Sequence, residues 1–268
     1  MRWNSKFAAL ATLLVVSWLS ARVRAEEKPV RLLFVLVGAG GHNVEVNTPP
    51  LLQTMDALGG FQVTLLAPPK GKPGDAAHLA KLAKIKRADY DVLVFYTTAS
   101  RLDTAAEKAI QSFVEQGGGL VALHGASGSF TNSKTCFQLV GGRFAGHAPG
   151  TYQLVINLVD VGHPITQGVE PFTITDEEYT YQFADGAKRH VLAQFRERPD
   201  KTVEKNGNND ILWTLEVGKG RVFQCGLGHD LKAWSNPSFQ KLVLQGIYWT
   251  AGRPKTVVLP DRKGDKGE

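Results

Sequence analysis

The chain has 268 residues with 31 Lys and Arg against 25 Asp and Glu, which gives a formal net charge of +6. Four of the bases, Arg2, Lys6, Arg22 and Arg24, lie in the first 25 residues, which contain no acid. The other residues carry 27 bases and 25 acids, a net charge of only +2. This balance excludes a strongly basic nucleic-acid-binding domain, so no nucleic-acid partner is expected.

Residues 1–25 have the pattern of a cleavable secretory signal. Arg2 and Lys6 precede an apolar run over residues 7–19, and Val23-Arg24-Ala25 places small side chains where a signal peptidase cleaves. The run is shorter than the roughly 20 residues of a membrane-spanning helix. We expect cleavage after Ala25 and export to the periplasm or the extracellular space, without a stable membrane span in the mature chain. An uncleaved anchor is the alternative.

Short apolar runs alternate with helical segments from Val30 onward. The expected strands cover residues 31–37, 61–67, 91–97 and 120–124. The expected helices cover residues 48–58, with Thr48-Pro49 at the start, 75–85, and 104–117, with a capping box from Thr104 to Glu107. This βαβαβαβ series predicts a doubly wound α/β sheet of parallel strands, in which ligands bind beyond the carboxyl ends of the strands.

The second half of the chain changes character. Strands expected over residues 152–159, 172–175 and 190–195 have no helices between them, which predicts an antiparallel extension. Residues 198–210 are expected to form a hairpin or exposed loop, residues 221–226 a strand, and Asn236-Pro237 the start of a helix through Thr250. The domain is expected to cover residues 26–253, followed by a disordered tail over residues 254–268.

The chain contains only two cysteines, Cys136 and Cys225. Two cysteines do not make a disulfide scaffold, even in an exported protein. Both lie in apolar surroundings, which favours two buried thiols over a catalytic thiol.

Reactive side chains gather in four segments near expected strand ends. His124 ends a buried strand in GGGLVALHGASGS, while Arg143 and His147 follow a short helix in LVGGRFAGH. His229, Asp230 and Trp234 follow the last strand in GLGHDLKAW. Imidazoles suit general acid and base chemistry, Arg143 suits a carboxylate or polyol, and Trp234 suits the wall of a sugar pocket.

The segment DEEYTYQ over residues 176–182 supplies acids and aromatic rings. Along a strand, Glu177, Tyr179 and Tyr181 would face one way and Asp176 the other. His229 and Asp230 are adjacent and cannot pair as the members of a catalytic triad do, so Glu177 is the expected partner of an imidazole. A solvated edge strand is the alternative.

Parts of the sequence also resemble a serine nucleophile elbow, a metal site and a dinucleotide-binding fingerprint. Gly125-Ala126-Ser127 matches part of a nucleophile elbow, although Ser129 stands where the second Gly belongs, so a serine hydrolase with His229 as base is one alternative. His124, His147 and His229 with a carboxylate would suffice to bind a divalent metal, although no H-x-x-x-H or C-x-x-C spacing supports it. No other cofactor is expected, because Asn43 replaces the third Gly of a dinucleotide fingerprint. The remaining histidines, His42, His78, His163 and His190, are expected to be loop, turn or peripheral residues.

Several of these stretches, in the same order, resemble the trehalose-utilisation (ThuA-like) family. They are GGGLVALHGA, LVGGRFAGH, HPIT, DEEYTYQ, GKGRVFQCGLGHD and AWSNPSF, and the resemblance covers residues 30–253. It implies a flavodoxin-like fold similar to class I glutamine amidotransferases. Those enzymes carry a nucleophilic Cys after the strand that here ends at His124, so glutaminase chemistry is not expected.

The resemblance also implies a function and a site. The family is linked to the use of trehalose and related disaccharides through keto-sugar intermediates. Its motifs fall on His124, Arg143, His147, Glu177, Tyr179, His229 and Asp230. We therefore expect an exported protein that cleaves or rearranges a keto-glycoside, with Arg143 and Trp234 holding the sugar. The alternative is a non-catalytic glycan-binding module that uses Tyr179, Tyr181 and Trp234 as stacking platforms.

Overall fold

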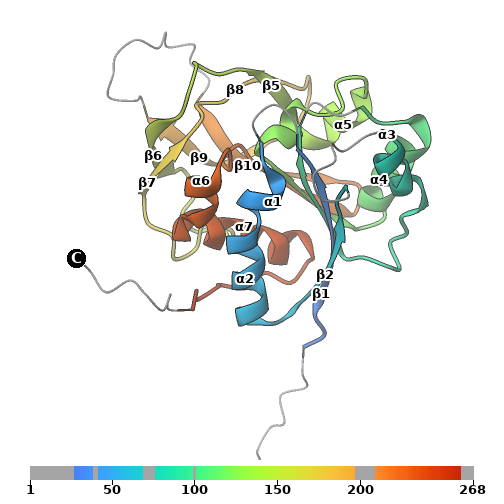
Figure 1. The fold of residues 1–268 in the computed structure, drawn as a ribbon, viewed down its shortest axis with the longest axis horizontal. Helices are drawn as coiled ribbons and strands as arrows, with labels where there is room; N and C mark the ends of the chain where they lie inside the picture. The colour runs from blue at the N-terminus through green and yellow to red at the C-terminus, as the bar shows by residue number, and fades with distance from the viewer. Residues whose placement is uncertain (1–26, 39–41, 69–75, 99–100, 197–208, 261–268) are drawn as a thin grey trace, which may run out of the picture.

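A computed structural model describes residues 27–38, 42–68, 76–98, 101–196 and 209–260 (Figure 1). The expected signal segment and most of the expected loop over residues 198–210 lie outside these ranges. Within them, no helix has the length and apolar character that a membrane crossing requires.

Five parallel strands form one half of a nine-stranded sheet, in the order β2-β1-β3-β4-β11. They are β1 (Val30–Val37), β2 (Phe61–Leu66), β3 (Val92–Thr97), β4 (Gly119–Leu123) and β11 (Gly220–Cys225). The runs β1, β3 and β4 are almost continuously apolar because both faces of these strands are buried. The expectation of a parallel α/β sheet is confirmed.

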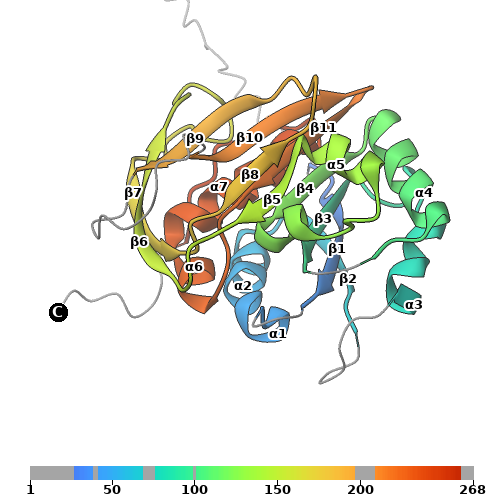
Figure 2. The ribbon, with the colours of Figure 1, turned by 90° about the horizontal axis from the view of Figure 1, so that it is seen from above.

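Helices cover both faces of this half (Figure 2). On one side lie α1 (Val44–Asn47), α2 (Pro49–Leu58), α6 (Leu231–Ser235) and α7 (Pro237–Thr250). On the other lie α3 (Ala76–Leu79), α4 (Thr104–Glu115) and α5 (Lys134–Val140). A short 3₁₀ helix, η1 (Ala80–Lys84), follows α3, so the helix expected over residues 75–85 is divided into two types.

The other half of the sheet is antiparallel and continues in the order β10-β9-β6-β7. These strands are β6 (Tyr152–Leu158), β7 (Phe172–Asp176), β9 (His190–Arg196) and β10 (Asp210–Val217). A separate hairpin-like pair, β5 (Gly142–Gly146) and β8 (Thr180–Phe183), lies against the sheet. The antiparallel extension is confirmed. Strands β5 and β10 were not expected from the sequence, and β8 covers only the end of the strand expected over residues 176–182.

The helix starts differ in detail from the expected caps. Asp103, not Thr104, accepts the Ala106 N–H and caps α4. Thr48 makes no side-chain cap for α2, because its hydroxyl donates to the Val44 carbonyl. Asn236 behaves as expected, since its side chain accepts the Phe239 N–H and Pro237 begins α7.

Part of the expected disordered tail is ordered. Val257 is buried, and its N–H donates to Gln245 Oε1 at 2.9 Å. This buried contact fixes the chain beyond Arg253, so the tail differs from the expectation as far as Pro260. Residues 261–268 lie outside the described ranges.

Both cysteines are buried free thiols, as the apolar surroundings predicted. Burial raises the pKa of Cys136 to about 11 and raises that of Cys225 further. Neither thiol is therefore a ready nucleophile at neutral pH.

Candidate functional site

Three histidines follow the carboxyl ends of three parallel strands. His42 follows β1, His124 follows β4 and begins the 3₁₀ helix η2 (His124–Gly128), and His229 follows β11. Ligands of open α/β sheets bind at this edge. The topology thus places three imidazoles at the preferred position for a site.

These histidines meet one carboxylate, Glu177. Glu177 Oε2 lies 3.2 Å from His124 Nε2 and 3.2 Å from His229 Nδ1. Glu177 Oε1 lies 3.6 Å from His147 Nε2, and His124 Nε2 lies 3.0 Å from His42 Nε2. We call these five residues the Glu177 cluster. The expected convergence of His124, His147, His229 and Glu177 is therefore present, and His42 joins them.

His124 is held rigidly at the bottom of the cluster. Its side chain is fully buried, and its Nδ1 lies 2.8 Å from the Gly226 carbonyl oxygen. The Tyr179 ring stacks on the imidazole with a centroid distance of 4.2 Å. The backbone of His124 has φ +47°, a left-handed conformation that costs energy for a residue with a side chain. Strain of this kind at a strand end is common at functional sites.

Glu177 lies on the link between β7 and β8. The Tyr179 N–H donates to the Glu177 carbonyl, which makes a tight turn. The turn interrupts the strand expected over residues 176–182, and β8 begins only at Thr180. Glu177 and Tyr179 both contact the His124 ring, as expected for residues on one face, and Asp176 and Glu177 are both buried.

Asp176 ties this link to the His229 loop. Its carboxylate accepts the Gly228 N–H at 2.7 Å, the His229 N–H at 3.1 Å and the Glu177 N–H at 2.8 Å. Gly228 has φ +123°, a conformation open to glycine. The loop after β11 is thereby fixed with the His229 ring toward Glu177.

Further hydrogen bonds support His229 from behind. Asn47 Nδ2 donates to the His229 carbonyl at 3.0 Å, and the Tyr96 hydroxyl donates to it at 3.2 Å. Trp234 Nε1 donates to the Gly228 carbonyl at 2.8 Å. Buried side chains therefore fix the backbone carbonyls of both Gly228 and His229.

The surroundings set the charges in the cluster. Burial opposes ionisation of Glu177, but contacts with His124 and His229 outweigh it and hold the pKa of Glu177 well below its usual value. The contact with Glu177 in turn raises the pKa of His229. Glu177 is therefore an anion at neutral pH, which suits an orienting carboxylate better than a proton donor.

The cluster opens to solvent on the His147 and His229 side. The side chain of His147 is 28% exposed and that of His229 is 21% exposed, against 8% for Glu177. A ligand would meet these two imidazoles first, with His124 and Glu177 beneath them.

Three residues expected in the site lie elsewhere or act differently. Arg143 is on the face of β5 opposite Phe144, which packs on Tyr179; Arg143 donates to Gln182 Oε1 and stacks over Phe137. Asp230 caps α6 by accepting the Lys232 and Ala233 N–H groups. Trp234 is completely buried and supports the Gly228 backbone. None of the three lines the opening of the cluster.

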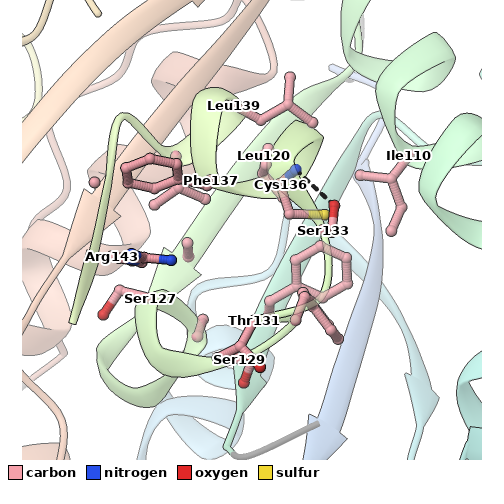
Figure 3. Close-up of a pocket in the computed structure, with 16 residues that line it drawn as sticks. Ile110, Leu120, Ser127, Ser129, Thr131, Ser133, Cys136, Phe137, Leu139 and Arg143 are labelled. Atoms are coloured by element: carbon pink, nitrogen blue, oxygen red, sulfur yellow. Dashed lines mark hydrogen bonds between the residues drawn. The ribbon is translucent and has the colours of Figure 1, made fainter. Parts of the chain in front are cut away.

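A mostly apolar cavity, which none of the residues of the Glu177 cluster lines, lies under α5 (Figure 3). Ser127, Cys136, Phe137 and Arg143 line it. Ser127 is buried and its hydroxyl donates to the His124 carbonyl, while His229, the base expected for it, directs Nδ1 toward Glu177. This arrangement does not provide the serine–imidazole pair of a nucleophile elbow.

Comparisons with known proteins agree with this description. A family model described as ThuA, trehalose utilisation, matches residues 32–250. The chain belongs to this family. The membership supports a carbohydrate-related role. A comparison with curated proteins gave no match.

Solved structures share the fold. A putative ThuA-like protein from Parabacteroides merdae has 20% identity and a TM-score of 0.72, over 86% of this chain and 93% of that one. A putative ThuA-like protein from Bacteroides uniformis has 17% identity and a TM-score of 0.62, over 87% and 96%. A β-galactosidase from Rahnella sp. R3 has 14% identity and a TM-score of 0.55, over 88% of this chain but 33% of the enzyme. At these identities the likeness extends to the fold alone.

Proposed function

We propose that this chain is an exported enzyme of carbohydrate utilisation that cleaves or rearranges a glycoside, with a keto-glycoside of the trehalose type as substrate class. The membership of the trehalose-utilisation family supports the substrate class. The observation that carries the enzymatic part is the Glu177 cluster, in which three imidazoles contact one buried carboxylate at the ligand-binding edge of the sheet.

The cluster contains the groups that proton transfer needs. His229 is accessible and contacts Glu177, so we assign it as the general base, with Glu177 as the orienting carboxylate. His147 contacts the other carboxylate oxygen and faces solvent, so it is placed to bind or protonate a leaving oxygen. Tyr179 keeps His124 in position by stacking on it.

This assignment fits the chemistry of a keto-sugar. A carbonyl group acidifies the hydrogen on the neighbouring carbon, and an imidazole can remove it to leave an enolate. When the glycosidic oxygen lies β to the carbonyl, the electron pair then expels that oxygen and the C–O bond breaks. The oxygen recovers a proton from an imidazolium, so the step balances without an added oxidant or reductant.

The structure gives little support to the two alternatives. Tyr181 and Trp234 are buried, and only a few percent of Tyr179 is exposed, so these rings offer no open platform to a sugar. Ser127 is turned toward a backbone carbonyl.

Two finer assignments belong to the same proposal. The parallel order β2-β1-β3-β4-β11 is that of flavodoxin-like sheets, which supports a class I glutamine amidotransferase-like fold without glutaminase chemistry.

The proposal that the protein is exported rests on the signal-like pattern of residues 1–25. Expression of the full chain in a Gram-negative host should release a periplasmic form that begins at Glu26, as N-terminal sequencing would show; a cytoplasmic chain that retains Met1 would contradict it.

The function is tested by incubating the purified protein with trehalose and with its keto derivative and following the products by NMR. We expect turnover of the keto-glycoside and its loss when His124 and His229 are both changed to Ala, with the circular dichroism spectrum preserved. Ligand affinity that survives this double change, together with no turnover by the wild type, would indicate a binding module instead.

A further inference from the structure

We propose that His42, His124, His229 and Glu177 together bind one divalent transition-metal ion, and that Zn²⁺ is the ion that fits them best. One ligand atom from each of the four residues lies within 4.8 Å of the others. Binding of the ion is tested without the proposed reaction; while the ion is bound, His229 is a ligand, and the role of base passes to His147, the imidazole outside the group of four.

Three of the six distances between the ligand atoms are close to those of a tetrahedral site. Zinc bonds to nitrogen and oxygen of about 2.0–2.1 Å place neighbouring ligands about 3.3 Å apart in a tetrahedron. The contacts here are 3.0 Å between His42 Nε2 and His124 Nε2, 3.2 Å between His124 Nε2 and Glu177 Oε2, and 3.2 Å between His229 Nδ1 and Glu177 Oε2. The remaining pairs lie within 4.8 Å, so small rotations of the side chains would bring all four atoms within bonding distance of one ion.

The tautomer of His124 is set for coordination. Its Nδ1 lies 2.8 Å from the Gly226 carbonyl oxygen, which can only accept, so Nδ1 carries the proton. Nε2 is then the ring nitrogen that faces His42 and Glu177, where an ion would lie. Metal-binding histidines are commonly oriented by such a bond from the other ring nitrogen to a backbone carbonyl.

Two of the four atoms lack ordinary hydrogen bonds. Glu177 Oε2 and His229 Nδ1 are buried and have no partner of hydrogen-bond geometry among the described residues, although they lie 3.2 Å apart. Buried polar atoms of folded proteins are rarely left in this condition. A cation among the four ligands would satisfy both atoms.

The ligand set selects the class of ion. Three imidazole nitrogens favour Zn²⁺ and its transition-metal neighbours, whereas Mg²⁺ and Ca²⁺ prefer oxygen. His147 stands apart, since its Nε2 is 3.6 Å from Glu177 Oε1 and it does not belong to the group of four. The metal ligands expected from the sequence were His124, His147 and His229. In the structure His42, and not His147, lies close enough to the other ligands.

One of the four ligands, His229, is also supported by residues around the site. Asp176 accepts the His229 N–H, and Asn47 donates to the His229 carbonyl. Asp176 is fully buried beside the site. An ion held there would act as a Lewis acid on a carbonyl oxygen only if it accepted that oxygen as a fifth ligand.

The test is metal binding by the full chain. After chelator treatment and dialysis, titration with Zn²⁺ should show one ion per chain, and Co²⁺ should give the visible absorption bands of a four-coordinate ion. His42→Ala and His229→Ala should each weaken Zn²⁺ binding by more than the roughly 10- to 100-fold that loss of an outer supporting residue costs. Both rings are only partly buried, so these variants should fold.

Two matched histidine variants serve as controls. His147→Ala should keep the affinity for Zn²⁺ within a few fold, because this ring lies outside the group of four and its Nε2 faces the other oxygen of Glu177. His190→Ala should leave it unchanged, since that ring pairs with Asp160 on the surface. A wild-type protein that binds no Zn²⁺, or binding that His42→Ala and His229→Ala leave unchanged, would overturn the proposal and leave the cluster as a proton network alone.

Discussion

Two carboxylates of this protein, Asp91 and Glu177, are each surrounded by basic side chains, at opposite ends of the parallel strands. Asp91 precedes β3 and contacts Arg31 Nη2 at 2.9 Å, Arg87 Nη1 at 3.3 Å and Arg253 Nη2 at 3.4 Å. Glu177 faces the carboxyl ends and contacts three imidazoles. In both cases burial opposes the charge and the basic neighbours outweigh it, which lowers the pKa.

The two sites differ in what their partners can do. The guanidinium groups around Asp91 carry a permanent charge, and Arg31 makes directed hydrogen bonds to both carboxylate oxygens. The imidazoles around Glu177 can gain or lose a proton or bind a metal, and Glu177 Oε2 has no partner of hydrogen-bond geometry among the described residues. The comparison indicates that Asp91 stabilises the fold and that Glu177 takes part in proton transfer or metal binding.

The largest expected effect is on turnover. His229→Ala removes the accessible imidazole, and we expect kcat/KM for a keto-glycoside to fall by about 10²- to 10⁴-fold, the usual contribution of a general base. His190→Ala is the matched control and should keep wild-type turnover, because its ring lies on the surface. Equal rates for the two variants would remove His229 from the mechanism.

A change at Asp91, which precedes β3, should lower the stability of the protein and leave its turnover intact. Asp91→Asn removes the charge that three arginines share, and we expect a loss of about 2 kcal/mol in the free energy of unfolding. For a domain of this size, that loss lowers Tm by about 4–8 °C. Calorimetry on the purified variant measures it, and an unchanged Tm would show that the arginine cluster adds nothing to the fold.

The wild type and Asp91→Asn should also differ in how their free energy of unfolding depends on pH. The hydrogen bonds from Arg31 and Arg87 overcome burial and lower the pKa of Asp91 to about 2. The unfolded value is about 3.9, so the contribution of Asp91 is present above about pH 4 and is lost as the pH falls toward 2. After allowance for solvent screening at the arginines, about 1–2 kcal/mol should disappear. Urea unfolding of wild type and Asp91→Asn should converge over this range; parallel curves would contradict the assignment.

The smallest expected effect is at Ser127. Ser127→Ala removes the hydrogen bond to the His124 carbonyl and the side-chain interaction with Tyr181, so we expect about 0.5–1.5 kcal/mol of destabilisation and turnover within about twofold of wild type. A fluorophosphonate probe should not label the folded protein. Loss of activity in this variant together with labelling of Ser127 would restore the serine hydrolase alternative.

The sequence predicted the parallel half of the fold best. Strands buried on both faces, such as β1, β3 and β4, are continuous apolar runs and are easily recognised. Strand β5 contains Gly142 and Gly146, and β8 has only four residues, so neither carries a clear alternation of polar and apolar side chains. Their pairing depends on contacts between distant parts of the chain.

The site residues that follow a recognisable strand could be predicted from the sequence. His124 and His229 follow recognisable strands, and Glu177 was the expected carboxylate partner. His42 follows β1 by the same rule, and the signal was available, but a histidine next to a glycine-rich loop was interpreted as a loop residue. Trp234 and Asp230 have the residue types of a site, yet burial and helix capping use them for structure, and sequence patterns do not reveal such contacts.

The most direct test of the Glu177 cluster exchanges each carboxylate for its amide. Glu177→Gln and Asp91→Asn should be compared side by side for kcat/KM on a keto-glycoside and for Tm. We predict crossed results: Glu177→Gln loses turnover by at least about 100-fold with little change in Tm, and Asp91→Asn loses Tm and retains turnover. Wild-type turnover in Glu177→Gln, with the loss appearing only in Tm, would contradict a catalytic role for the cluster.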